Sequence, residues 1–481
     1  MSSTSLLALG LAFISSVSAG RHGYPQFGEK QFSQSFLDGY NLLKFTSSLG
    51  PYSDRVSYGV DRNTPAGCQV DQVFLLMRHG ERYPDYSGFG SNYETVLAKM
   101  AATQKNDSSS WKGDLAFLND WTYYVDDPAM YSQESYSGAY AGLADAYSRG
   151  TDYRLRYGHL WDKKSVVPIF SSGYERVIET ARYFGQGFFG YNYSTSAAVN
   201  IISESATQGA NSLTPSCPAD PTYVSCLVGS FSRTMPELGV AAARFNSQNP
   251  GLNLTALDVS YLMQMAAFEL NVRAYTPWAE AFTLDEWVAY GYIWDLMYYY
   301  CVGPGSDYQI AVGQVYTNAT RVLMEAGPKS GSMFWSFVHD ANITPVVAAL
   351  GLDIPANPLP NDTIPFPNQY RVADIVPMGG HLTLERMTCN ATVKSTAGIY
   401  VRAVINEAVV PFNACQNGPG YSCPLANYSS LIVDAAPRFD EKCNTSSSYP
   451  QYLDFFWNYN TSTQYNFQDG PIGYQLTDTN V

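Results

Sequence analysis

Five continuous runs of hydrophobic residues stand out along the chain, separated by longer stretches that mix apolar and polar positions. They cover residues 72–77, 166–170, 333–338, 381–386 and 400–404. Their length suits β-strands, and because apolar residues do not alternate with polar ones, both faces of each strand are expected to be covered. The pattern predicts an α/β fold with a mainly parallel, helix-flanked sheet.

Helical signals lie between these runs. Ser172 and Glu175 have the spacing of a capping box, ahead of a segment whose apolar positions 177, 178, 181 and 184 share one face. Thr344 followed by Pro345 predicts the N-terminus of another helix, and Gly351 predicts its end.

The middle of the chain has a different character. Residues 205–330 contain helix-like runs at 256–269, 283–299 and 308–325 and little strand signal. We therefore expect a second, mainly helical insertion domain over 205–330, set into an α/β domain formed by 20–204 and 331–481.

The N-terminus has the features of a secretory signal. Residues 1–19 contain an apolar core and end in small residues, which predicts a signal peptide cleaved after Ala19. Eight cysteines and ten Asn-x-Ser/Thr sites agree with secretion to the extracellular space or cell wall. No later stretch has the roughly 20 uninterrupted apolar residues of a membrane span, so no membrane association is expected. Cys415 and Cys423 enclose the shortest loop and are the pair expected first.

Charge and histidine content narrow the range of partners. The 42 acidic residues outnumber the 28 Lys and Arg residues and give a formal net charge of −14, which disfavours nucleic acid as a partner. The five histidines have none of the usual zinc spacings, so neither a metal nor another cofactor is expected. The oligomeric state is left open, a homo-oligomer included.

The first hydrophobic run leads into a string with candidate chemistry, Arg78-His79-Gly80-Glu81-Arg82-Tyr83-Pro84. Two guanidinium groups can hold a phosphoryl group against the imidazole, and their charge disfavours its protonation, so that His79 can act as a nucleophile in acid. The alternative is a surface turn in which Glu81 pairs with the arginines and His79 is incidental. Arg21-His22-Gly23 repeats the tripeptide without a preceding strand, and we interpret that copy as incidental.

A second histidine follows the hydrophobic run at 333–338. It is His339, with Asp340 next to it. Side chains beyond the carboxyl ends of parallel strands converge on one crevice, so His339 is expected to share a site with His79. His339 can donate to a phosphate oxygen and Asp340 can protonate a leaving alkoxide. A carboxylate stabilised by the following helix N-terminus is an equally good description of Asp340 and is compatible with that role.

Residues 78–84 together with His339 and Asp340 resemble the paired signatures of the histidine acid phosphatases. The similarity extends over nearly the whole chain after residue 19 and is greatest toward the secreted fungal acid phosphatases of the phytase B type. Further stretches that carry it lie at 112–124, 171–181 and 377–386.

The resemblance implies hydrolysis of phosphate monoesters through a phosphohistidine, without a metal. It implies His79 as phosphate acceptor, Asp340 as proton donor, and Arg78, Arg82 and His339 as phosphate ligands. Many phytases have a further arginine where this chain has Phe170, and Arg176 is the candidate replacement. The resemblance also implies the disulfides Cys68–Cys389 and Cys415–Cys423.

Substrate scope is expected to be broad, with phytase activity, because no basic rim of the kind found in phytate-preferring relatives is apparent. Glu286 resembles an acidic specificity position of this branch and is a candidate substrate-binding residue, although Thr283 and Glu286 also have capping-box spacing.

Two alternatives to a secreted phosphatase are a mutase-type phosphoryl transferase and a catalytically silent glycoprotein that keeps the fold. Asn342 lies three residues from His339, and we predict that this glycosylation site is unoccupied.

Overall fold

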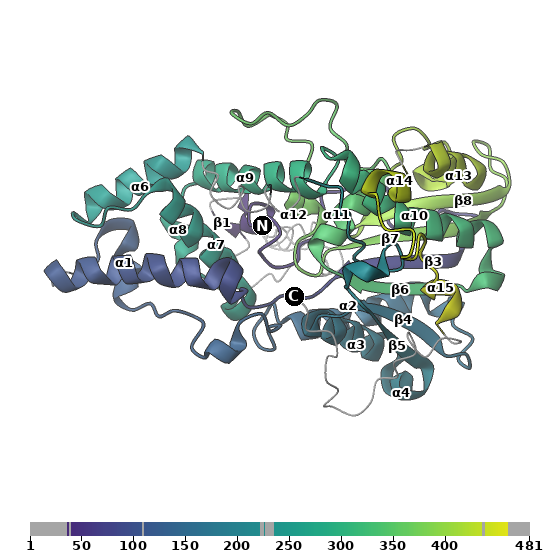
Figure 1. Cartoon of the computed structure of the whole chain (residues 1–481), viewed down its shortest axis with the longest axis horizontal. Helices are drawn as coiled ribbons and strands as arrows, with labels where there is room; N and C mark the ends of the chain where they lie inside the picture. Colours follow the sequence, from purple (N-terminus) through teal and green to yellow (C-terminus); the bar gives the residue numbers. More distant parts are fainter. Residues whose placement is uncertain are drawn as a thin grey trace, which may run out of the picture.

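The computed structural model describes residues 36–37, 40–107, 110–221, 226, 235–434 and 438–459. The predicted signal peptide and the Arg-His-Gly copy at 21–23 lie outside these residues. A lobe built on a β-sheet and a lobe made of helices lie side by side along the long axis of the molecule (Figure 1).

The central sheet has the strand order β10-β8-β7-β3-β6-β4-β5, with β9 paired to β8. Its strands are β3 (Cys68–Arg78), β4 (Val167–Ser172), β5 (Ala197–Ile202), β6 (Met333–Val338), β7 (His381–Cys389), β8 (Gly398–Ile405), β9 (Ala408–Val409) and β10 (Cys423–Pro424). Two short strands, β1 (Phe36–Leu37) and β2 (Tyr40–Asn41), pair separately. The predicted α/β fold is confirmed, and all five expected strands are present.

The sheet is mixed in direction. Strands β3, β6, β4 and β5 pair in parallel, whereas β7 is antiparallel to both β3 and β8. The eight residues between β7 and β8 form a hairpin connection, which is too short for the crossover that parallel neighbours require. The sequence pattern could not show this, since buried strands are apolar on both faces in either direction.

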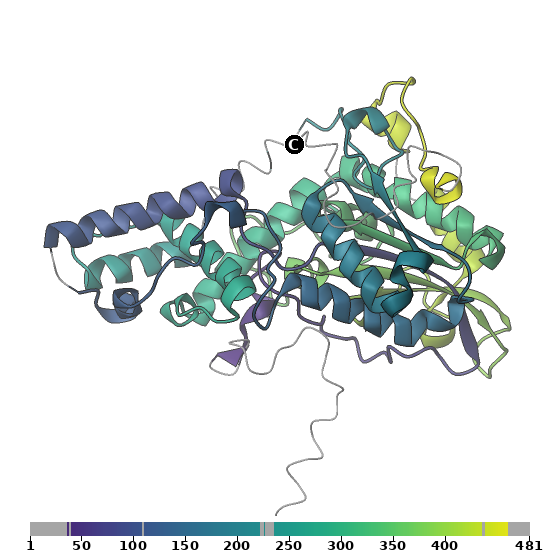
Figure 2. The ribbon, with the colours of Figure 1, turned by 90° about the horizontal axis from the view of Figure 1, so that it is seen from below.

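Helices cover both faces of the sheet. On one side lie α2 (Gly142–Tyr157) and α3 (Glu175–Phe189), and on the other α10 (Asp307–Ala326), α11 (Asp340–Ala349) and α13 (Leu425–Asp434) (Figures 1 and 2). In β3, Val73, Leu75 and Met77 pack toward one helical layer, whereas Phe74 and Leu76 pack toward the other. Burial on both faces explains the continuous apolar run of this strand.

The helical lobe combines two parts of the chain. It contains α1 (Ser91–Asp107), α6 (Pro236–Gln248), α7 (Ala256–Arg273), α8 (Trp278–Ala281) and α9 (Leu284–Val302). Thus α1, from before the predicted insertion, packs on α7, whereas α10, from within it, packs on α11 beside the sheet. The domain division at 205 and 330 remains a prediction.

Two expected helix starts are wrong. Helix α3 has Tyr174 as its N-cap without a side-chain cap, because Ser172 is still the last residue of β4. Helix α11 begins at Asp340 rather than near Thr344, and Pro345 lies inside it. The backbone N–H of His339 donates to Asn342 Oδ1 at 3.3 Å, which favours the earlier start. Gly351, with φ of 68°, follows the end of α11 as predicted.

Short helices complete the fold. They are α4 (Tyr193–Ser196), α12 (Val372–Ile375), α14 (Phe439–Cys443) and α15 (Phe455–Asn458). Among the helices of the described residues, none is both long enough and apolar enough to cross a membrane.

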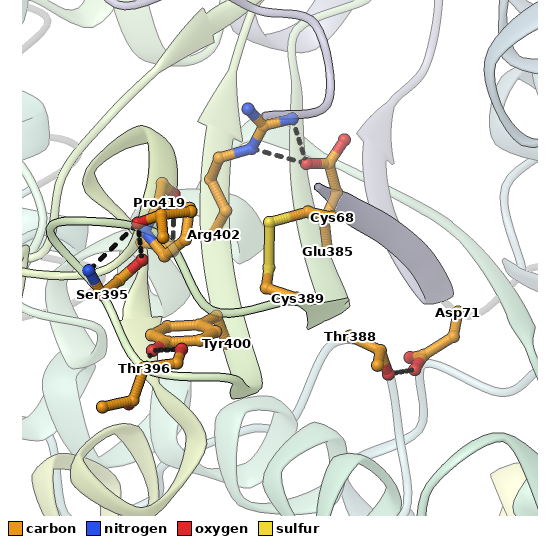
Figure 3. Close-up of a disulfide and its surroundings, with 12 residues drawn as sticks. Cys68, Asp71, Glu385, Thr388, Cys389, Ser395, Thr396, Tyr400, Arg402 and Pro419 are labelled. Atoms are coloured by element: carbon orange, nitrogen blue, oxygen red, sulfur yellow. Dashed lines mark hydrogen bonds and ion pairs between the residues drawn. A yellow bond between two sulfur atoms is a disulfide. The ribbon is translucent and has the colours of Figure 1, made fainter. Parts of the chain in front are cut away.

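Four disulfides cross-link the fold, and both of the expected pairs are among them. Cys68–Cys389 joins the start of β3 to the end of β7, where the two residues are register partners (Figure 3). Cys415–Cys423 joins two residues that are eight positions apart in the sequence. The pairs Cys217–Cys443 and Cys226–Cys301, which the sequence left open, span separations of 226 and 75 residues.

Candidate active site

The carboxyl ends of β3 and β6 bring two histidines together. His79 follows β3 and His339 follows β6, and these strands are adjacent and parallel. The centroids of the two imidazole rings lie 5.8 Å apart at an interplanar angle of 66°. The predicted convergence of the two motifs on one crevice is therefore present in the structure.

The segment 78–84 is buried, which rules out the surface turn that was the alternative interpretation. Glu81 Oε1 accepts a hydrogen bond from the backbone N–H of Tyr52 at 2.8 Å. Gly80 packs so closely that a Cβ atom would lie 2.7 Å from the carbonyl oxygen of Gly142 and 2.8 Å from Glu134 Oε1. The small residue is therefore required by this packing.

His79 has the protonation and orientation of a nucleophile. Its Nδ1 lies 2.9 Å from the carbonyl oxygen of Gly80, which can only accept, so Nδ1 carries the proton and Nε2 keeps its lone pair. Burial lowers the pKa of His79 well below its usual value, and the charges of Arg78, Arg176 and Arg82 lower it further. The neutral imidazole therefore persists in acidic solution.

Arg82 and Arg176 flank the nucleophile and share one carboxylate. Arg82 Nη2 lies 2.9 Å from Asp85 Oδ2, and Arg176 Nη1 lies 3.6 Å from Asp85 Oδ1. Burial and the charge of Arg82 lower the pKa of Arg176 to about 10, so the guanidinium group of Arg176 stays charged in acid. Although burial opposes ionisation, the two arginines bring the pKa of Asp85 to about 2.

Asp340 lies at the first turn of α11, beside the nucleophile. Its Oδ1 accepts from the backbone N–H of Ala341 at 2.7 Å, and its Oδ2 pairs with Arg78 Nη2 at 2.6 Å. Burial opposes ionisation of Asp340, but the charge of Arg78 and a hydrogen bond from Tyr298 outweigh it and lower its pKa. Asp340 is thus a carboxylate at the N-terminus of α11, as one interpretation of the sequence expected, and it also lines the candidate site.

Arg78 lies beneath the site. It is fully buried, and its Nη1 donates to the carbonyl oxygens of Ser48 and Val376, the latter at 2.8 Å. It is not among the residues that line the cavity described below. A direct contact between Arg78 and phosphate remains a prediction, while its pairing with Asp340 is observed.

Several residues of the site were missed by sequence reasoning. Glu204 follows β5, a strand that was not predicted, and its Oε1 lies 3.2 Å from His339 Nε2. Ser172 Oγ lies 3.5 Å from the same nitrogen, and the ring of Tyr174 is perpendicular to the His339 ring at 4.9 Å. The available signal was the position of Glu204 just after a short apolar run, 197–202, at the same sheet edge.

These side chains open into a cavity of about 660 Å³. Its lining includes His79, His339 and Asp340 from the sheet edge, together with the aromatic residues Phe89 and Trp294. The charged residues that line it are Arg82, Asp85, Arg176, Glu204, Asp220 and Asp340. No lysine of the described residues lines this cavity, which agrees with the absence of an apparent basic rim in the sequence.

Glu286 is not brought to this cavity. It is buried at the N-terminus of α9, where it forms a capping box with Thr283 and a bidentate ion pair with Arg244. The structure therefore agrees with the interpretation of Glu286 as a helix-capping residue. Glu286 is therefore not among the proposed substrate contacts.

The other described histidines lie away from the cavity lining. His381 is buried and pairs with Glu407 Oε1 at 3.2 Å, and His159 Nε2 lies 3.0 Å from the carbonyl oxygen of Val70. These contacts agree with structural roles.

Comparison with known proteins identifies relatives over most of the chain. The phytase PHO112 of Candida albicans is 39% identical over 440 residues, which are 89% of this chain and 93% of that protein. The constitutive acid phosphatase of Saccharomyces cerevisiae is 33% identical over 89% of this chain and 91% of its own length. A crystal structure of the phytase from D. castellii superposes with a TM-score of 0.82 at 32% identity, covering 92% of this chain and 98% of that one.

The family model of the histidine phosphatase superfamily (branch 2) matches residues 69–406. This range begins in β3 and contains both histidine motifs, Arg176 and Glu204. The chain therefore belongs to branch 2 of the histidine phosphatase superfamily.

Proposed function

We propose that this protein is an acid phosphatase that hydrolyses phosphate monoesters through a phosphohistidine at His79. The observation that carries the proposal is the pair of imidazoles of His79 and His339, 5.8 Å apart at adjacent parallel strand ends, with Arg82 and Arg176 in the same cavity. Relatives named as acid phosphatases and phytases support it, and the catalytically silent alternative and the mutase alternative have no such support.

In the first step, His79 Nε2 attacks the phosphorus atom and the bond from phosphorus to the ester oxygen breaks. Arg82, Arg176 and His339 stabilise the phosphoryl oxygens, where charge is concentrated. The departing alkoxide takes a proton from the Asp340 carboxyl group. In the free site Asp340 is held in its ionised form, and the negative charge of a bound phosphate raises its proton affinity, which favours the acid form when substrate is present.

In the second step, water attacks the phosphorus atom and the nitrogen–phosphorus bond breaks. The Asp340 carboxylate takes a proton from the attacking water, so phosphate leaves and the carboxyl group is restored. His79 returns to its neutral form, which burial and the neighbouring arginines favour. No step of this sequence requires a metal or another cofactor.

Broad substrate scope, with phytase activity, fits the composition of the cavity. Arg82 and Arg176 are partly neutralised by Asp85, and further carboxylates line the walls. Such a lining gives little extra stabilisation to substrates with many phosphate groups, so simple monoesters are expected to be hydrolysed at least as well as inositol hexakisphosphate.

We also propose that the protein is secreted. Four disulfides cross-link the described residues, and most asparagines of the predicted glycosylation sites in this part of the chain are exposed. Both features fit an oxidising compartment.

The direct test is release of phosphate from p-nitrophenyl phosphate at about pH 3 by purified, glycosylated protein, with and without a chelator. We expect turnover that the chelator does not change. No turnover would favour a silent glycoprotein, and loss of activity on chelation would contradict the metal-free mechanism.

A further inference from the structure

Three arginines and one histidine in and beneath the cavity each lie within ion-pair distance of a carboxylate. The pairs are Arg78–Asp340 at 2.6 Å, Arg82–Asp85 at 2.9 Å, Arg176–Asp85 at 3.6 Å and His339–Glu204 at 3.2 Å. Asp340 has the proposed proton-transfer role, whereas nothing in the proposed chemistry uses Glu204. A carboxylate beside a phosphate site opposes anion binding, so the placement of Glu204 calls for a separate explanation.

Glu204 lies at the same sheet edge as the catalytic residues. It follows β5 by two positions, and its side chain is 19% exposed where it lines the cavity. Its Oε1 and Ser172 Oγ both approach Nε2 of His339, at 3.2 and 3.5 Å. The edge of His339 that carries Nε2 therefore faces a carboxylate acceptor.

His339 is the group that both this carboxylate and a phosphoryl oxygen can use as a donor. Its ring lies 5.8 Å from the ring of His79, so a phosphoryl group on His79 would be near His339 and in the field of Glu204. We propose that Glu204 is an internal counter-anion that competes with phosphate for His339 and thereby weakens phosphate binding whenever its carboxylate is ionised. This inference rests on the proposed function of the same site.

The surroundings of Glu204 decide the pH range of this effect. Burial opposes its ionisation, but the hydrogen bond and charge of His339, with contributions from Ser172 and Arg176, lower the pKa of Glu204 below its usual value. The competing charge is therefore present above this lowered pKa and is lost as the pH falls through it. The charged and titratable groups around the pair are His79, Arg82, Asp85, Tyr174, Arg176 and Asp340.

The other carboxylates of the cavity differ in ways that make them controls. Asp85 is ionised above about pH 2 and contacts arginines rather than His339. Asp220 also lines the cavity, but its Oδ2 accepts from Gln309 Nε2 at 2.9 Å. Asp220→Asn thus removes a carboxylate from the same cavity without changing the partner of His339.

The test is calorimetric titration of the full glycosylated protein with inorganic phosphate, which requires no turnover. Wild type, Glu204→Gln and Asp220→Asn are compared between about pH 2.5 and pH 6, a range in which phosphate is mainly a monoanion. Because one like charge beside the anion is removed, Glu204→Gln should bind phosphate roughly tenfold more tightly at about pH 6 and within about twofold of wild type at the acid end. Asp220→Asn should change the dissociation constant by a small factor without this pH dependence.

Weaker phosphate binding by Glu204→Gln at every pH would overturn the inference and make Glu204 a residue that only positions His339. An equal effect in Asp220→Asn would also overturn it, because the effect would then be a general property of cavity charge. If Glu204→Gln does not fold, Glu204→Ala and Glu204→Asp are titrated in the same way, with tighter binding expected for Ala and the wild-type pH dependence for Asp. Failure of the proposed function is recognised separately, as phosphate binding by wild type without hydrolysis of p-nitrophenyl phosphate.

Discussion

Asp340 Oδ2 and Arg78 Nη2 form an ion pair of 2.6 Å. This pair joins the proposed proton donor on α11 to the last residue of β3. A hydrogen-bonded arginine favours the carboxylate form of Asp340, and in the proposed mechanism Asp340 becomes an acid only as negative charge accumulates on the bound phosphoryl group.

Replacing Asp340 by Asn should slow esters of basic alcohols far more than activated esters. The amide keeps the size of the side chain but cannot protonate the leaving oxygen, and general acid assistance is worth roughly 10²–10⁴-fold in rate. We expect losses of that order in kcat/KM for an alkyl phosphate and a loss of about tenfold or less for p-nitrophenyl phosphate. Equal losses on both substrates would mean that Asp340 acts only by holding Arg78.

Replacing His79 by Ala should abolish the covalent intermediate while the fold is kept. Rapid acid quenching with a radiolabelled substrate should trap label on the wild-type protein and none on His79→Ala, and turnover should fall by at least about 10⁴-fold. His159→Ala is the matched control, since His159 is an exposed histidine whose ring contacts a backbone carbonyl. Normal labelling of His79→Ala would show that another residue accepts the phosphoryl group.

Asn342 should carry no glycan. It lines the cavity, and its side chain is held beside His339 by the hydrogen bond from the His339 backbone N–H to its Oδ1, so a glycan on its Nδ2 would fill the site. Asn361 is exposed and serves as the comparison. Glycopeptide mass spectrometry of the secreted protein should find Asn342 unmodified, and an occupied Asn342 in active protein would contradict the placement of the site.

Glu134 should make the protein less stable as the pH rises toward neutrality. Burial raises its pKa to about 8, while its carboxyl group accepts hydrogen bonds from the backbone N–H of Gly80 and from Thr180. Between the usual carboxyl pKa and about pH 8, the folded state holds a proton that the unfolded state releases. This contribution is therefore complete in acid and is lost as the pH rises through that window.

Glu134→Gln keeps an acceptor for Gly80 but cannot ionise. We expect the fall in the free energy of unfolding between about pH 4.5 and pH 8 to be smaller in this variant than in wild type by several kcal/mol at most. Chemical denaturation at a series of pH values measures the difference, with Glu441→Gln, at an exposed position, as the control. An unchanged pH dependence in Glu134→Gln would show that this carboxyl group does not hold the proton.

The sequence was sufficient for the five expected strands and for the two histidine motifs that meet at one sheet edge. The runs at 72–77 and 333–338 are continuous and end in unusual polar residues, so local pattern identified both β3 and β6 and the histidines that follow them. Helix starts were less predictable, because Ser172 and Thr344 both satisfy the rules for N-caps. Ser172 is instead paired in β4, and the helix that contains Thr344 already begins at Asp340.

Only the tertiary structure decided which residues far apart in the chain contact one another. Glu204 and His339 are separated by 135 positions, and Cys217 and Cys443 by 226. Such contacts depend on which strands are neighbours and on the direction in which they run, and a buried apolar run carries no record of its neighbour. The charges that surround His79, and therefore its chemistry, are determined by strand order as much as by the residues adjacent to it.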